Sequence, residues 1–259
     1  MWIVVFIGIM GAIFGSFVAC QAWRMRYKEL GKKNPGKFSV CLACGEKLKW
    51  CDNIPIVSWL VLRGRCRKCH EKIGLMEILS EVGLAVVFVL LGIKFVHNGM
   101  SVMEIMKLIM LLVTICGMWF LLLYDAKWGE LPGRILWIVV ILAAIYAVLN
   151  QAVWWQTLMA IGILAGTYYL LYMFSHEKLV GSGDWILCLA VALVLGNWWL
   201  ALLELFLSNL LASLMALPRF FKKHDGKIRK TQVHFGPFLV VAMVIILVLE
   251  RFLLKALAF

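Results

Sequence analysis

Charged side chains are scarce in this chain. They make up 15% of its 259 residues, whereas 64% of the residues are hydrophobic. A typical water-soluble domain has about 25% charged residues and a smaller apolar share. The composition therefore excludes an ordinary soluble protein and predicts an all-α polytopic membrane protein.

Polar interruptions are also few, and they divide the chain into eight apolar runs. A helix needs roughly 20 residues to cross about 30 Å of hydrocarbon. The runs are approximately 2–23, 74–96, 102–124, 131–149, 154–174, 184–199, 200–217 and 233–254. The fourth and sixth runs, 131–149 and 184–199, are short if only their uncharged residues are counted, so each is expected to begin within the polar segment before it. We predict about eight transmembrane helices.

The first apolar run lacks the marks of a secretory signal. It has no basic residues before it and no small-residue cleavage site, so we interpret 1–23 as a retained transmembrane helix. Basic residues follow it at once, beginning with Arg24, Arg26 and Lys28. Because cytoplasmic loops are enriched in lysine and arginine, its first residue is expected outside the cell.

The distribution of basic residues supports the same orientation throughout. Of the 26 lysines and arginines, 22 lie in loops that share one side in an eight-helix topology. That side is predicted to be cytoplasmic, with both termini outside. The net charge of +12 is then explained by topology and anionic lipid headgroups, and no nucleic-acid partner is expected.

Acidic residues are rarer still, and two of them lie beside apolar runs. Asp125 follows the run 102–124, and Asp184 opens the run 184–199. A carboxylate in the bilayer core costs roughly 2.5–3.5 kcal/mol on insertion scales, so such residues usually serve chemistry or ion movement. A transporter would use them for ions, with Glu77, Glu81 and Glu204 as further candidates. An aspartyl protease would need the pair to share one proton.

Cysteines are concentrated in the only sizeable segment between apolar runs, 24–73. It contains Cys41-Leu-Ala-Cys44 and Cys66-Arg-Lys-Cys69. Two CxxC pairs predict a structural zinc site with four thiolate ligands, which leaves no position open for catalysis. Free or disulfide-bonded cysteines are the alternative, and Cys51 and His70 are possible substitute ligands.

Glycine occurs at spacings that allow close contacts. Gly11-x-x-x-Gly15 and Gly162-x-x-x-Gly166 are candidates for close helix packing, although such spacings are common in membrane segments. Gly181-Ser182-Gly183 suits a tight entry to the helix that carries Asp184.

Longer motifs are distributed along nearly the whole chain. They are Gly15-Ser16-Phe17, the two cysteine pairs, the run Trp50-Cys51-Asp52-Asn53-Ile54-Pro55-Ile56-Val57-Ser58-Trp59-Leu60, Asp125 with Leu131-Pro132, Gly181-Ser182-Gly183-Asp184, and Phe235-Gly236-Pro237-Phe238. In these motifs the chain resembles the bacterial type IV prepilin peptidase family, which belongs with the GxGD intramembrane aspartyl proteases. The run from Trp50 is far more specific than a CxxC pair.

The resemblance implies an enzyme of the bacterial inner membrane that acts on the cytoplasmic face. Its substrates would be prepilins or pseudopilins, whose basic leader is removed after a glycine. Many members then methylate the new N-terminal amine with S-adenosylmethionine. Matched to the family motifs, Asp125 and Asp184 would be the catalytic pair. Gly181, Ser182 and Gly183 would form an active-site loop. The range 74–259 would be a seven-helix protease core.

The resemblance also implies that the segment 24–73 is associated with methylation. Gly15, Ser16, Phe17 and Glu77 are candidates for a role in methylation or substrate handling. No glycine-rich dinucleotide fingerprint identifies a cofactor pocket, so S-adenosylmethionine is expected to bind between the zinc-bearing segment and membrane helices.

The chain departs from the family pattern at three places. Val18-Ala19-Cys20-Gln21 follow the Gly15 motif where members often have an asparagine, Ile186 replaces a frequent lysine, and Gly133 replaces a polar residue. The first departure leaves the methylation site open. A carboxylate-dependent transporter and a non-catalytic zinc-bearing scaffold remain as alternative functions.

Overall fold

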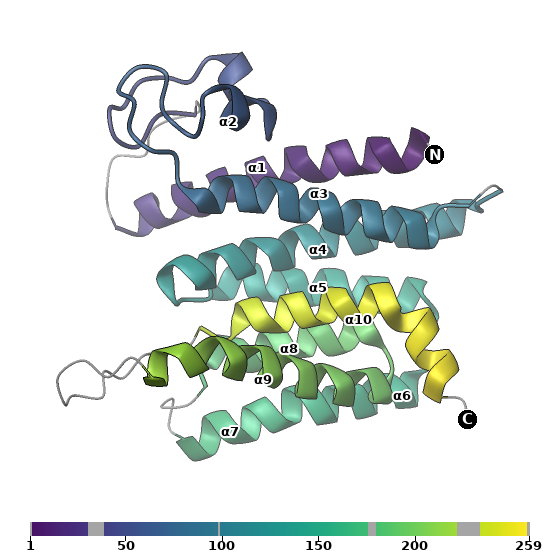
Figure 1. Ribbon diagram of the computed structural model, residues 1–259. Helices are drawn as coiled ribbons and strands as arrows, with labels where there is room; N and C mark the ends of the chain where they lie inside the picture. The colour runs from purple at the N-terminus through teal and green to yellow at the C-terminus, as the bar shows by residue number, and fades with distance from the viewer. Residues whose placement is uncertain (1, 31–38, 98, 176–179, 222–233, 258–259) are drawn as a thin grey trace. The chain divides into compact units, whose positions relative to one another are not determined.

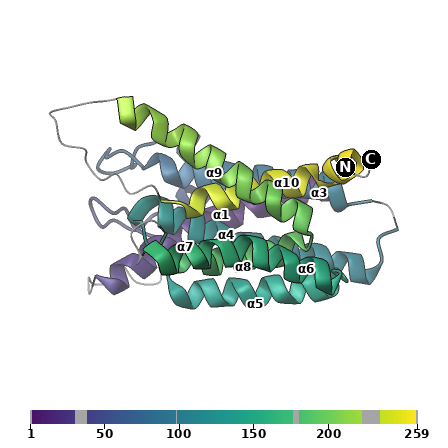
Figure 2. The same ribbon diagram turned by 90° about the horizontal axis from the view of Figure 1, so that it is seen from below.

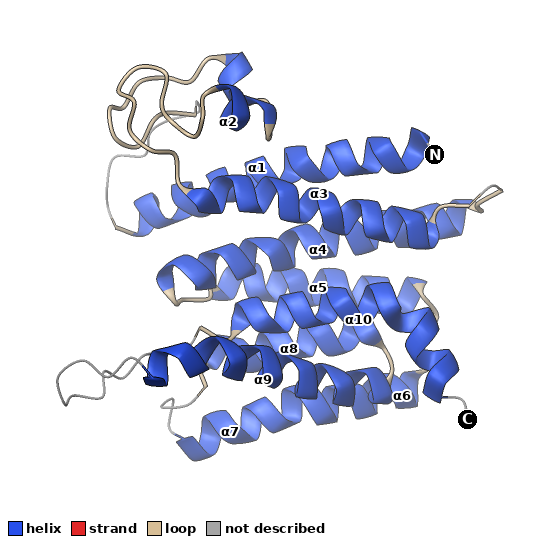
Figure 3. Ribbon diagram, in the orientation of Figure 1, coloured by secondary structure: helices blue, strands red, loops and turns tan. Residues whose placement is uncertain are grey.

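The computed structural model describes the chain except residues 1, 31–38, 98, 176–179, 222–233 and 258–259. Most of the described residues are helical, and no strand occurs among them beyond two isolated bridges, Val40 with Lys47 and Arg65 with Lys72 (Figure 3). The expectation of an all-α protein is confirmed. The chain forms two compact units, Met1–Gly99 and Met100–Phe259.

The N-terminal unit pairs two long helices, α1 (Trp2–Glu29) and α3 (Leu75–Phe95), which pack along each other. Between them in sequence lie η1 (Trp50–Asn53) and α2 (Val57–Val61). A Cβ atom at Gly11 would lie 2.8 Å from the carbonyl oxygen of Leu84, and one at Gly15 would lie 2.6 Å from that of Ser80. Ser80 also donates a hydrogen bond to the Gly15 carbonyl. The first glycine pair therefore provides the close helix contact that its spacing predicted.

The C-terminal unit consists of helices that run alternately up and down (Figures 1 and 2). They are α4 (Val102–Trp128), α5 (Gly133–Leu149), α6 (Trp154–Ile161), η2 (Gly162–Gly166), α7 (Thr167–Ser175), α8 (Ser182–Leu195), α9 (Trp198–Phe221) and α10 (Gly236–Leu257). The segments α6, η2 and α7 follow one another without a break. Helix α8 contacts α5, α6, α7 and α10 and is the centre of this unit.

Five helices are long and apolar enough to cross a membrane in the part of the chain that the structure describes. They are Trp2–Glu29, Leu75–Phe95, Val102–Trp128, Trp154–Ser175 and Trp198–Leu217. The other three predicted runs form shorter apolar helices, Gly133–Leu149, Ser182–Leu195 and Gly236–Glu250. At 1.5 Å per residue, the 14 residues of α8 extend only about 21 Å. Among the described residues, five of the eight predicted spans are therefore supported by length, and the other three are not confirmed.

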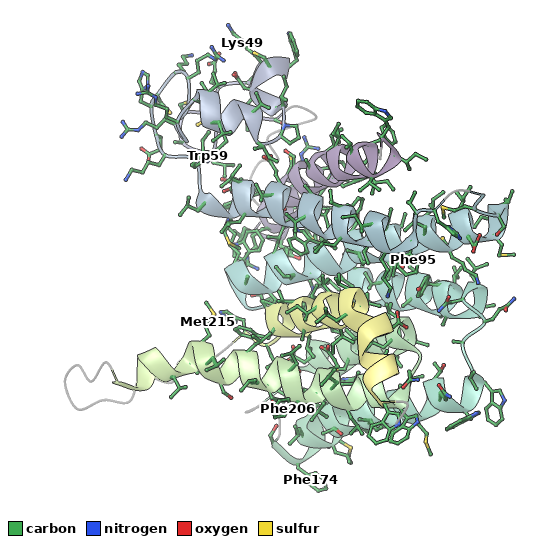
Figure 4. The ribbon with its side chains drawn as sticks, turned by 45° about the vertical axis from the view of Figure 1, so that its right-hand side comes forward. Lys49, Trp59, Phe95, Phe174, Phe206 and Met215 are labelled. Atoms are coloured by element: carbon green, nitrogen blue, oxygen red, sulfur yellow. The ribbon has the colours of Figure 1, made fainter. Side chains whose placement is uncertain are left out.

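The faces of these helices that point away from the protein are apolar. Phe174 and Phe206, labelled in Figure 4, are 82% and 63% exposed. Large exposed apolar surfaces are unusual in soluble monomers and suit contact with lipid tails.

Several predicted run ends differ from the helices; α1, for example, continues to Glu29. At two of these ends a glycine ends the helix. α4 continues past residue 124 to Trp128, where Gly129 adopts φ 68° and ends it. α8 stops at Leu195 because Gly196 adopts φ 60°, so α9 begins at Trp198 and the predicted boundary at 199 was misplaced. Both ends are left-handed caps, which glycine adopts without steric cost.

The second glycine pair does not pack as its spacing suggested. Among the described residues, no atom outside the local helix lies within 4 Å of a Cβ built at Gly162 or Gly166. These two glycines bound the π-helical turn η2 instead.

Candidate active site and metal centre

Asp125 lies in the last turn of α4, in the interior of the C-terminal unit, and is 5% exposed. Its Oδ2 atom accepts a hydrogen bond of 2.9 Å from the backbone N–H of Gly236, the first residue of α10. A Cβ at position 236 would lie 2.7 Å from the same oxygen. Only glycine therefore lets the start of α10 approach the carboxylate this closely.

Asp184 lies in the first turn of α8 and is 9% exposed. Its Oδ2 atom accepts a hydrogen bond of 3.0 Å from the backbone N–H of Gly181. The next glycine of the motif, Gly183, faces the side chain of Leu131. A Cβ added at Gly183 would lie only 2.7 Å from the Cβ of Leu131. The loop between α4 and α5 therefore packs directly on the start of α8.

No hydrogen bond joins the two carboxyl groups among the described residues, and the link between them is the charge of Asp125, which acts on Asp184. Each accepts an N–H at the start of a helix, where unpaired amides and the helix dipole favour negative charge. Burial has the opposite effect, since it disfavours the charged form of a carboxyl group. This arrangement suits a pair in which one member keeps a proton and the other does not.

His234 is a neighbour that the sequence did not identify as part of the site. Its imidazole lies against Gly129 at the end of α4, so closely that a Cβ at Gly129 would overlap the ring. Its charge also acts on Asp184. In the sequence it directly precedes Phe235-Gly236-Pro237-Phe238. Only the packing of α10 against α4 brings it near the aspartates.

The four predicted zinc ligands come together in the N-terminal unit. The Sγ atoms of Cys41, Cys44, Cys66 and Cys69 all lie within 4.8 Å of one another, and those of Cys41 and Cys69 are 3.8 Å apart. A tetrahedral site with Zn–S bonds of about 2.3 Å has sulfur atoms about 3.8 Å apart. The four thiols therefore fit a metal ion.

The two cysteine pairs have the same backbone turn. In the first pair, Cys41 N–H donates to the Glu46 carbonyl and Gly45 N–H to Cys41; in the second, Cys66 N–H donates to Glu71 and His70 N–H to Cys66. Gly45 and His70 take corresponding positions with φ 71° and 55°. His70 therefore occupies the turn position of this knuckle and is not among the four clustered ligands. Cys51 is not in the cluster either.

Ion pairs link the segments around the cluster. Arg67 donates two hydrogen bonds to Asp52 Oδ1, at 3.1 and 2.6 Å, and its guanidinium holds the pKa of Asp52 below its usual range. Lys68 pairs with Glu46 across the two knuckles. Backbone N–H groups of Cys69 and Lys68 lower the pKa of the Cys66 thiol to about 7, which favours the thiolate that a metal needs.

The three residues of the motif Gly15-Ser16-Phe17 lie in three different environments. Gly15 is used for helix packing, as described above, and Phe17 is 55% exposed. Ser16 faces a cavity together with Glu77. Glu77 accepts a 3.0 Å hydrogen bond from the indole N–H of Trp23. Of the four candidates for a methylation role, Ser16 and Glu77 thus line one cavity.

A strained turn adjoins this cavity. Ile56 has φ 62° and ψ −52°, and Val57 N–H donates to the Pro55 carbonyl at 2.6 Å, which makes the segment a γ-turn. A β-branched residue at such angles costs about 1–3 kcal/mol. The Glu81 carboxylate accepts the Ile56 N–H at 2.7 Å and holds the turn in place. Sequence reasoning placed Glu81 on the face of Glu77 but could not foresee this contact.

Glu204, the other membrane carboxyl considered from the sequence, is fully buried in α9. Among the described residues neither of its oxygens has a hydrogen-bond partner. Asn209, one turn later, donates to the Tyr168 hydroxyl at 3.0 Å and so joins α9 to α7. Asn209 thus makes an interhelical hydrogen bond in this unit, whereas the Glu204 carboxyl makes none among the described residues.

Comparison with known proteins agrees with the motifs. The family described as the bacterial peptidase A24 N-terminal domain matches residues 9–95. The resemblance to the prepilin peptidases is confirmed. A prepilin leader peptidase/N-methyltransferase of Vibrio cholerae is 24% identical over 92% of this chain and 93% of its own length. No solved structure gives a significant match.

Two further prepilin peptidases are similar at slightly higher identity. Both are named prepilin leader peptidase/N-methyltransferase and are 29% identical to this chain. The protein from Pectobacterium carotovorum matches over 95% of this chain and 93% of its own length. The protein from Pseudomonas putida matches over 79% of this chain and 69% of its own length. These names bear out the expectation of a peptidase that is also a methyltransferase.

Proposed function

We propose that the chain is an intramembrane aspartyl endopeptidase that removes the basic leader of prepilins or pseudopilins after a glycine. The observation that supports it best is that Asp125 and Asp184 are both buried and that each accepts a hydrogen bond from a glycine N–H. In this reaction the ionised carboxyl draws a proton from water while the protonated one donates to the scissile carbonyl. The predicted active-site loop is in fact the start of α8, with Gly181 as its cap and Ser182 and Gly183 as its first residues; its small side chains leave room for a substrate backbone.

The membrane arrangement belongs to the same proposal. The five long and three shorter apolar helices together give eight spans, with both termini outside and the aspartates on the cytoplasmic side of the inner membrane. Trp154 and Trp155 open α6, and Trp198 and Trp199 open α9, with the last two rings stacked at 4.0 Å. Tryptophan is enriched at membrane interfaces, so these four residues mark the outer face. The segment 24–73 then lies in the cytoplasm beside lipid headgroups.

Zinc and S-adenosylmethionine complete the proposed enzyme. Cys41, Cys44, Cys66 and Cys69 hold a structural zinc ion, since all-thiolate tetrahedral sites in a reducing compartment favour zinc. S-adenosylmethionine, when bound, supplies the methyl group for the new N-terminal amine. The names of the relatives support this second activity. The N-terminal unit, which carries the metal site, is the part that we assign to it.

The proposal is tested with purified full-length protein and a prepilin substrate. Wild type should release the leader by one cut after a glycine, whereas Asp125→Asn and Asp184→Asn should each lower the cleavage rate at least about 10²-fold. Glu104→Gln is the matched control, because Glu104 lies at the other end of α4, where its carboxylate accepts the N–H of the N-cap residue Ser101. Cleavage at the wild-type rate by either aspartate variant would remove that residue from the mechanism. Ion flux without any cleavage would instead establish the transporter alternative.

A further inference from the structure

Tyr168 is a buried tyrosine of the C-terminal unit that takes no part in the cleavage chemistry described above. It lies in α7 and is 3% exposed. Among the described residues it forms no hydrogen bond with Asp125 or Asp184, so it is not a catalytic residue. Burial of a hydroxyl group costs free energy unless the group is hydrogen-bonded. The contacts of this side chain therefore indicate its role.

The π-helical turn η2 sets the direction in which Tyr168 points. η2 ends at Gly166, two residues before Tyr168, and α7 continues from it without a break. A π-helical turn contains about one residue more than an α-helical turn, so it rotates the side chains that follow by roughly 100° about the helix axis. In this register Tyr168 points into the unit, whereas its neighbour Tyr169 is 42% exposed.

Helix α9 holds the Tyr168 hydroxyl through two side chains. The side-chain N–H of Asn209 donates a hydrogen bond of 3.0 Å to it, and the fully buried Ser208 hydroxyl also hydrogen-bonds with it. Both partners are themselves fixed. Asn209 donates to the Leu205 carbonyl at 2.7 Å, and Ser208 donates to the Glu204 carbonyl at 2.7 Å. The phenol is therefore attached to one turn of α9.

The ring of Tyr168 packs on Phe235, the residue directly before α10. The two ring centroids are 5.1 Å apart and the ring planes are inclined at 39°, which is within the range of favourable aromatic pairs. The Phe235 carbonyl accepts hydrogen bonds from the N–H groups of Phe238 and Leu239, so Phe235 is the residue from which the helix starts. Contact with Tyr168 therefore fixes the first turn of α10 at its side chain.

The peptide group after Phe235 carries the donor to the Asp125 carboxylate. A peptide bond is planar, so the Phe235 carbonyl and the Gly236 N–H belong to one rigid group. The carbonyl is bound by the first turn of α10, and the N–H donates to Asp125 Oδ2 at 2.9 Å. A shift of the Phe235 side chain would move this group and change the distance from the amide to the carboxylate.

These contacts form a continuous series from α9 to Asp125. We propose that Tyr168 is a positioning residue: anchored on α9, it holds Phe235 and thereby keeps the Gly236 amide against the Asp125 carboxylate. This role rests on the protease function proposed above, because Asp125 is the group that is positioned. Misplacement of a reacting group by about 1 Å can lower a rate about 10²-fold. The effect of Tyr168 should therefore appear in kcat and not in KM.

Cleavage of a prepilin by purified full-length variants tests this role. Tyr168→Leu removes the ring and should lower kcat about 10- to 100-fold, with KM within about twofold of wild type. Tyr168→Phe keeps the ring and loses only the hydroxyl, so it should retain most of kcat. Tyr146→Leu is the matched control, because Tyr146 is 4% exposed but lies on α5. It should lose similar thermal stability and keep kcat.

The position of the amide is measured without any cleavage by hydrogen–deuterium exchange at Gly236. In Tyr168→Leu this amide should exchange at least about tenfold faster than in wild type, because a hydrogen bond that is held less firmly opens more often. In Tyr146→Leu its exchange rate should be unchanged. Gly236→Ala combined with Tyr168→Leu should lower kcat little further than the more severe single change, since both act on one carboxylate.

Three results would each overturn the proposal. They are unchanged exchange of the Gly236 amide in Tyr168→Leu, a loss of kcat in the double variant equal to the product of the two single losses, and an equal loss of kcat in Tyr146→Leu. Full cleavage by Asp125→Asn would instead refute the protease mechanism. The exchange measurement would still decide whether Tyr168 positions the amide, so the two failures are distinguishable.

Discussion

Replacement of Gly236 by alanine tests whether the start of α10 sets the position of the Asp125 carboxylate. The added Cβ would lie 2.7 Å from Asp125 Oδ2 and 3.4 Å from its Cβ, whereas ordinary contacts are 3.4 Å or longer. The carboxylate must therefore move by roughly 0.7 Å. Misplacement of a reacting group by about 1 Å can lower a rate about 10²-fold. We expect Gly236→Ala to lower kcat for prepilin cleavage about 10- to 100-fold, which corresponds to about 1.4–2.7 kcal/mol of transition-state stabilisation.

The assay compares kcat, KM and thermal stability for Gly236→Ala with those for Gly133→Ala. Gly133 opens α5 in the same unit, and among the described residues nothing lies within 4 Å of its added Cβ. Gly133→Ala should cleave at close to the wild-type rate. If Gly236→Ala retains full kcat, or if both variants lose the same activity, the glycine does not set the carboxylate geometry. A loss of kcat with an unchanged melting temperature separates misplacement from unfolding.

Two further predictions concern the N-terminal unit. Metal analysis should find about one zinc per chain in wild type and none after combined Cys41→Ser and Cys66→Ser changes; retention of zinc by the double variant would contradict the site. Gly15→Ala should destabilise the packing of α1 on α3 by about 1–3 kcal/mol, because its Cβ would lie 2.6 Å from the Ser80 carbonyl oxygen. Gly166→Ala is the control, because its added Cβ meets nothing among the described residues. Thermal unfolding compares the two variants, and an equal loss of stability in both would contradict this role for Gly15.

The sequence predicted the elements of this protein better than their ends. Apolar runs locate helices because burial in lipid or protein depends on composition, and the CxxC spacing located the metal site because each pair is a local turn. Helix ends depended on single glycines. Gly129 and Gly196 adopt left-handed angles that no apolar pattern encodes, so the ends of α4 and α8 were placed several residues away from their observed positions.

Contacts between distant segments were the least accessible to sequence reasoning. The Phe235-Gly236-Pro237-Phe238 motif was visible, but its role as the amide partner of Asp125 depends on how α10 packs against α4. Glu81 was visible as a carboxylate near Glu77, yet its bond to Ile56 depends on the path of the segment between α1 and α3. In both cases the residue types were known and the pairing was not.

The bond from Gly236 to Asp125 also has a consequence for the order in which this protein is made. Asp125 leaves the ribosome 111 positions before the amide that holds it. While the last helix is still being synthesised, the carboxylate lacks its hydrogen-bond donor and the wall that packs over it. The surroundings of this carboxylate are therefore completed only when α10, the last helix of the chain to be synthesised, packs against α4.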